Sequence, residues 1–171
     1  GSTLSSVLNV REGLVSPQRI QAVLSMLTTT STSYILLASL DAARKQLATR
    51  GHEMLGRVIA LAEWARCEIN AIPGLWCLGA EDMGGLSSSH GCDPTKLCVS
   101  VKGLGLSGLE VERLLRDRHH IEIEMSDLYN ILAIVTFADS ERTVAALVEA
   151  LRQVAQSVAV RRPRRVHVRL P

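Results

Sequence analysis

A chain of 171 residues with 47% apolar and 21% charged residues has the balance of a globular protein and is long enough for one domain or one and a half. Aromatic residues make up only 3%, so the core must be built from Leu, Val, Ile and Ala. The net charge of +2 is too small to argue for a nucleic-acid partner, and no apolar run approaches the roughly 18–20 residues of a membrane helix.

The first half of the chain is predicted to be mainly helical. Residues 5–10 could form a strand, after which Pro17 opens a helix, because proline at the first helical turn lacks only an N–H that would be unpaired anyway. The apolar stretch 34–50 predicts a mostly buried helix closed by Gly51. A second long helix follows over 52–71 and ends before a Pro-Gly pair.

A Gly-, Ser- and Asp-rich stretch over residues 79–94 indicates a loop and a domain boundary. The alternation from Lys96 to Val101 then predicts a strand, and Ser107 with Glu110 forms the pattern of a capping box at a helix start. Cysteine usage favours a reduced, cytoplasmic protein, since none of the four cysteines lies in a CxxC pair.

The last part of the chain is predicted to complete a small layered domain. Strands are expected at Ile121–Glu124 and Ile131–Phe137, and Asp139 is expected to cap a final helix. The resulting order of strand, helix, strand, strand, helix predicts an α+β layer with two helices on one face of an antiparallel sheet.

Three sequence patterns can each be explained either by a functional site or by a purely structural role. The TTTSTS run from Thr28 could cradle a phosphate at a helix start, or Ser31 or Thr32 could simply cap that helix. Glu122 and Glu124 alternate on the expected strand, where they could form a solvated face or bind a cation in a cleft. The Gly-rich run at 103–108 lacks a P-loop lysine and is better explained as a flexible entry to the capped helix.

Two further patterns are weaker. A zinc site at His90, Cys92 and Cys98 matches no strong ligand spacing, and no fourth ligand is evident. Arginines crowd the last eleven residues, 161–171, which could be an RNA- or phosphate-binding tail or a solvated linker. The linker is favoured because no aromatic residues are interleaved for base stacking, so nucleic acid is not expected as a partner.

Five segments occur in an order that resembles one family. They are VLNVREG at 7–13, TTTSTSYILLASLDAARKQL at 28–47, AIPGLWCLG at 71–79, DPTKLCVSVKGLGLSGLEVERLLRD at 93–117 and IEIEMSDLYNILAIVTFAD at 121–139. Together they resemble the ornithine/lysine/arginine decarboxylases, whose parent fold is the α/β fold of the pyridoxal 5'-phosphate (PLP)-dependent aspartate aminotransferases. The resemblance implies that residues 1–92 are the C-terminal part of the PLP-binding large domain, and that residues 93–171 are a small α+β domain with a basic tail.

The resemblance also implies site residues. The acidic residue before the Tyr-Asn pair, Glu124, is expected to bind the distal amino or guanidinium group of a basic amino acid substrate. The hydroxyl run is expected to reach the neighbouring subunit's site, with Thr29 binding substrate and Ser31 binding cofactor across a homodimer or higher oligomer. The family has proline where this chain has Thr32, so the turn there is expected to be looser.

One departure limits the expected activity. The family's PLP lysine lies in a His-Lys pair just upstream of VLNVREG. The GSTLSS stretch at 1–6 either replaces the sequence after that pair or aligns Ser2 with the lysine, and serine cannot form a Schiff base. The chain is therefore expected to be an inactive portion of a decarboxylase acting on lysine, arginine or ornithine. The alternative is a non-catalytic interaction or regulatory module that binds amines or a partner decarboxylase chain.

Overall fold

A computed structural model describes residues 8, 10–11, 13–28, 31, 33–83 and 91–161, with the backbone alone at 159–161. The chain divides into two compact units, Gly1–Glu53 and Met54–Pro171. The proposed boundary between the large and small domains, after residue 92, stays a prediction.

The first unit contains helix α1 (Pro17–Leu27) and the beginning of α2 (Tyr34–Asn70). Pro17 opens α1 as predicted, and the Ser16 hydroxyl accepts a hydrogen bond from the Arg19 N–H at 3.5 Å. The expected helix end at Gly51 is wrong, because α2 continues through it. Glycine ends a helix by taking a left-handed conformation, and Gly51 does not have a positive φ. The strand expected at 5–10 lies largely outside the described residues.

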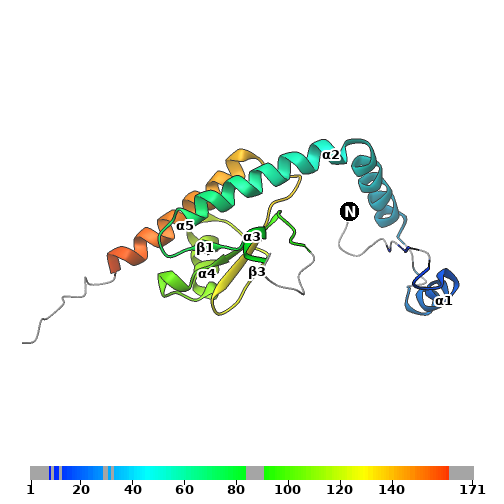
Figure 1. The fold of residues 1–171 in the computed structure, drawn as a ribbon, viewed down its shortest axis with the longest axis horizontal. Coiled ribbons are helices and arrows are strands. Elements are labelled where there is room, and N and C mark those ends of the chain that lie inside the picture. Colours follow the sequence, from blue (N-terminus) through cyan, green and yellow to red (C-terminus); the bar gives the residue numbers. More distant parts are fainter. Residues whose placement is uncertain are drawn as a thin grey trace, which may run out of the picture. The chain divides into compact units, whose positions relative to one another are not determined.

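The second unit is built on a four-stranded antiparallel sheet in the order β1-β2-β4-β3. Figure 1 labels the two outer strands of this sheet, β1 and β3. Its elements after α2 are β1 (Trp76–Cys77), α3 (Ala80–Met83), β2 (Lys96–Ser100), the 3-10 turn η1 (Lys102–Leu104), α4 (Gly108–His119), β3 (Met125–Ser126), β4 (Asn130–Ile134) and α5 (Glu141–Arg161). The predicted α+β order of strand, helix, strand, strand, helix is confirmed by β2, α4, β3, β4 and α5.

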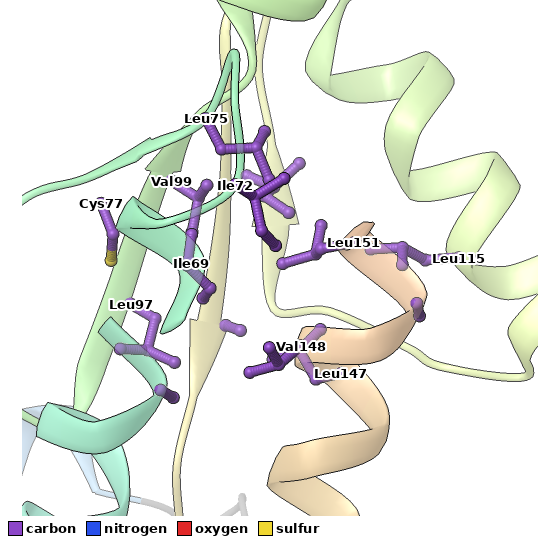
Figure 2. Close-up of a cluster of buried hydrophobic side chains, with 14 of the residues drawn as sticks. Ile69, Ile72, Leu75, Cys77, Leu97, Val99, Leu115, Leu147, Val148 and Leu151 are labelled. Carbon is purple, nitrogen blue, oxygen red and sulfur yellow. The ribbon is translucent and has the colours of Figure 1, made fainter. Parts of the chain in front are cut away.

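Alternation along the central strands separates a buried face of the sheet from an open one. Leu97 and Val99 of β2 and Ile131 of β4 are at most 1% exposed and point into the core, whereas their neighbours along the strands are less buried. The core is completed by apolar side chains from α2, α4 and α5. Figure 2 shows Ile69 of α2 and Val148 and Leu151 of α5 gathered against the strands.

The capping box at the start of α4 is confirmed. The Ser107 hydroxyl accepts a hydrogen bond from the Glu110 N–H, and the Glu110 carboxylate accepts one from the Ser107 N–H at 2.8 Å. The strand expected at Ile121–Glu124 is wrong, since the paired residues are Met125 and Ser126. Ile121 and Ile123 alternate because they pack against the core, without joining the ladder of strand hydrogen bonds.

The start of α5 also differs from the expectation. The Thr143 N–H donates to the Ser140 hydroxyl at 3.3 Å, so Ser140 and not Asp139 provides the cap. Asp139 instead accepts a hydrogen bond from the Thr136 N–H at 2.8 Å, which closes the loop after β4. In the part of the chain that the structure describes, no helix is both long and apolar enough to cross a bilayer.

Candidate functional site

The sequence-predicted substrate residue, Glu124, lies on the outer edge of the sheet. It directly precedes β3, and its N–H donates to the Leu132 carbonyl of β4 at 2.9 Å. This bond continues the β3–β4 pairing by one residue and fixes the backbone from which the carboxylate projects. The Glu124 side chain is exposed, whereas its backbone N–H is fixed by the hydrogen bond to Leu132.

The turn that follows β3 is organised by Asp127. Its carboxylate accepts hydrogen bonds from the N–H groups of Tyr129 and Asn130, both at 2.7 Å, and from the Asn130 amide. These bonds, with the Tyr129 N–H bond the largest cause, lower the pKa of the Asp127 carboxyl. Helix α4 begins directly against this turn, because a Cβ on Gly108 would lie 2.1 Å from the Asn130 carbonyl oxygen.

A polar cluster ties α4 to the segment that carries Glu124. The Ser126 hydroxyl donates to one carboxylate oxygen of Glu112, and Arg116 pairs with the other. Arg116 also reaches Glu122 through its Nε, at 2.9 and 3.0 Å from the two carboxylate oxygens. The bond from Ser126, followed by that from Arg116, lowers the pKa of the Glu112 carboxyl, and pairing with Glu122 above all raises the pKa of Arg116.

Glu124 differs from its two acidic neighbours in having no partner. Glu112 and Glu122 are both paired with Arg116, whereas the Glu124 carboxylate makes no hydrogen bond or ion pair within the described residues. Nearby on the same hairpin, Met125 is 61% and Tyr129 49% exposed. An exposed carboxylate without a partner can form a charge-assisted hydrogen bond with a cationic ligand.

The hairpin already binds a cation elsewhere. The Lys102 Nζ lies 5.4 Å from the centre of the Tyr129 ring, within the range of a cation–π interaction. This lysine therefore occupies one face of the ring.

The other two predicted site residues lie in the first compact unit. Thr29 lies outside the described residues. Ser31 is described and exposed, three residues before α2 begins at Tyr34. Their roles toward substrate and cofactor across a dimer stay predictions, as does the phosphate cradle.

Sequence reasoning missed the cluster that holds Glu124 in place. The pairing of Glu112 with Arg116 follows a helical i, i+4 spacing, a signal that the sequence contains. The bonds to Glu122 and Ser126 span 6 and 14 residues, so they depend on how the segment turns back along α4.

The described residues do not fit a covalent PLP site. Such a site needs a lysine at the cofactor, enclosed and close to groups for the phosphate and the pyridine nitrogen. The chain's three lysines, Lys45, Lys96 and Lys102, are all exposed, and none lines an enclosed cavity of the described residues.

The metal and tail hypotheses gain no support. Within the described ranges, no three His, Cys, Asp or Glu side chains are grouped to hold a metal ion, and His90 lies outside those ranges. The arginine tail beyond residue 161 lies outside them as well.

Two solved structures share the fold. The E. coli constitutive lysine decarboxylase superposes with a TM-score of 0.62 at 18% identity, covering 86% of this chain and 26% of that one. The Francisella novicida lysine decarboxylase superposes with a TM-score of 0.67 at 18% identity, covering 84% and 24%. The α+β arrangement with its open-faced sheet is therefore one found within much larger decarboxylase chains.

Sequence comparison defines the family. The model of the Orn/Lys/Arg decarboxylase major domain matches residues 1–143, and the chain belongs to this family. An arginine decarboxylase of Halalkalibacterium halodurans is 58% identical over 153 residues, covering 90% of this chain and 31% of that protein. One of Bacillus subtilis is 54% identical over 157 residues, covering 92% and 32%. The chain thus spans about a third of the length of these relatives.

Proposed function

We propose that this chain is the substrate-side portion of a PLP-dependent arginine decarboxylase, the class of enzyme that releases the α-carboxylate of arginine as CO2 and leaves agmatine. In this proposal Glu124 binds the distal guanidinium group. Arginine is preferred over lysine and ornithine because the relatives that are 54–58% identical are arginine decarboxylases. The family membership supports the reaction class, and its α/β parent fold is part of the proposal.

The observation that carries the proposal is the unpaired carboxylate of Glu124 on a fixed backbone. A guanidinium is planar and presents parallel N–H groups that match the two oxygens of a carboxylate. A contact at the far end of the substrate would set its position relative to the α-carbon, which is where the chemistry takes place.

The cofactor belongs to the proposal as well. When bound, PLP supplies the electron sink that makes loss of CO2 feasible. Because the described residues do not fit the cofactor, we expect this chain alone to bind the substrate's guanidinium group and not to release CO2. No observation favours a purely regulatory module. The proposal also includes a homodimer, in which Thr29 and Ser31 reach the site of the neighbouring subunit. It further includes a cytoplasmic location.

Binding measurements test the substrate contact. In calorimetry the chain should bind arginine and agmatine more tightly than lysine or ornithine, and Glu124→Gln should weaken agmatine binding about tenfold, the loss of one charge-assisted interaction. Asp117→Asn is the matched control, since Asp117 is exposed on α4 and makes no hydrogen bond within the described residues. Equal losses in the two variants would contradict the proposal.

Activity is tested separately. With PLP and arginine added, the isolated chain should release no CO2, whereas the complete product of its gene should form agmatine. Robust turnover by the isolated chain would overturn the expectation that the cofactor site lies elsewhere. Turnover of lysine but not arginine by the gene product would overturn the proposed substrate.

A further inference from the structure

Three carboxylates come from α4 and from the segment before β3. They are Glu112 on the helix, and Glu122 and Glu124 on the segment. Any of the three could attract a guanidinium or ammonium group by charge alone. A cationic group of a ligand can bind selectively to one of these carboxylates only if the other two are already paired.

Arg116 engages those two. Its Nε lies 2.9 Å from one oxygen and 3.0 Å from the other oxygen of Glu122, and its terminal nitrogen pairs with Glu112. The second oxygen of Glu112 accepts the Ser126 hydroxyl. Helix α4 is therefore hydrogen-bonded to the chain at Glu122, two residues before Glu124, and at Ser126, two residues after it.

We propose that Arg116 is the positioning residue of the cation site: it occupies Glu112 and Glu122, so that a guanidinium ligand is directed to Glu124. This inference rests on the proposed function of Glu124 and extends it to the group that makes the contact selective. Arg116 touches no substrate in this arrangement and acts through the two carboxylates.

The physical reason is competition between neighbouring anionic groups. Without Arg116, Glu122 would present an unpaired carboxylate two residues from Glu124, and Glu112 would lose one of its two partners. A cationic ligand would then distribute over several carboxylates and lose its defined position. Overall affinity for a small cation could persist while its dependence on Glu124 disappears.

The test measures that dependence with agmatine as the probe. Binding to the chain is followed by calorimetry and by the amide NMR signals of Met125 and Asp127, for the unaltered chain and for Arg116→Met, each with and without Glu124→Gln. In the unaltered background Glu124→Gln should weaken binding about tenfold, and in the Arg116→Met background less than about threefold. Arg113→Met is the matched control, since Arg113 is exposed on the same helix and makes no ion pair within the described residues.

Two further variants separate selectivity from folding. Arg116→Lys keeps the charge but cannot bond both carboxylates as a fork, so it should restore only part of the dependence on Glu124. A chain with Arg116→Met, Glu112→Gln and Glu122→Gln has no competing carboxylates, and its full dependence on Glu124 should return. Failure of that dependence to return would overturn the inference, since a general loss of structure would then explain the effect.

The outcomes distinguish this inference from the proposed function. If Glu124→Gln has no effect in the unaltered chain, or if agmatine at about 10 mM does not bind, the proposed function fails and the inference with it. If Glu124→Gln weakens binding equally with and without Arg116, the proposed function stands and the inference alone is overturned.

Discussion

Arg66 of α2 donates its Nε–H to the Leu78 carbonyl oxygen at 2.8 Å and is 9% exposed. The same guanidinium reaches the carbonyl oxygens of Pro94 at 3.0 Å and Lys96 at 3.2 Å. One buried cation therefore joins α2 to the chain on both sides of the 84–90 segment and to the start of β2. It supplies hydrogen bonds that the loop backbone would otherwise lack.

Replacing this arginine should destabilise the second unit. Arg66→Met would leave partly buried carbonyl groups unpaired, at a cost of about 3 kcal/mol in the free energy of unfolding. The measurement is urea unfolding followed by the fluorescence of Trp64 and Trp76, which both lie in this unit. Arg118→Met is the control, because Arg118 is exposed and makes no hydrogen bond within the described residues, and a similar loss there would contradict the prediction.

The close approach of α4 to the β3–β4 turn predicts an intolerant glycine. In Gly108→Ala the new Cβ would lie 2.1 Å from the Asn130 carbonyl oxygen and 2.5 Å from that of Asp127, so the backbone must shift. We expect a loss of about 2 kcal/mol or more in unfolding free energy. Gly56→Ala, on α2 with nothing within 4 Å, should instead gain about 0.5–1 kcal/mol. Equal effects of the two variants would rule out the clash.

The turn at Asp127 should make stability depend on acid pH. Hydrogen bonds from Tyr129 and Asn130 hold the pKa of this carboxyl below its usual value of 3.8. The stabilisation is therefore fully present above about pH 4 and is lost as the pH falls through the lower, folded pKa. Asp127→Asn should flatten the pH dependence of unit 2 unfolding between pH 7 and pH 2, measured by tryptophan fluorescence. A profile as steep as that of the unaltered chain would contradict this assignment.

The cysteines should differ sharply in reactivity. Burial raises the pKa of the Cys77 thiol to about 11, whereas the Cys67 thiol is exposed. At about pH 8, iodoacetamide should alkylate Cys67 readily and modify Cys77 only after unfolding in urea, as followed by mass spectrometry of peptides. Comparable rates for the two residues in the folded chain would show that Cys77 is not enclosed in solution.

Sequence patterns predicted the fold correctly where the interactions behind them span only a few residues. Pro17 at a helix start and the Ser107–Glu110 capping box were both predicted and are both confirmed, because each rests on backbone groups within one turn. Gly51 was misread, since a glycine ends a helix only if its φ becomes positive, which depends on what lies around it. Strand β1, two residues long, gave no periodic signal, and it forms because Trp76 and Cys77 pair with β2.

The substrate-binding role of Glu124 stays a prediction. Glu124 came from the resemblance, and the match of residues 1–143 confirms the family on which that resemblance rested. Glu122 and Glu124 look equivalent in sequence, but the structure separates them, because Arg116 binds the first and leaves the second without a partner within the described residues. That difference arises from a turn after His120, whose φ of 55° sends the chain back along α4.

The two outer strands have a consequence for association between chains. β1 and β3 are each two residues long, so each edge of the sheet offers few backbone groups to a strand from another molecule. Growth of the sheet by strand addition is thereby disfavoured, and with it the extended ladders that lead to fibres. Any association between copies of this part of the chain would then have to use side-chain surfaces instead of a shared ladder of strands.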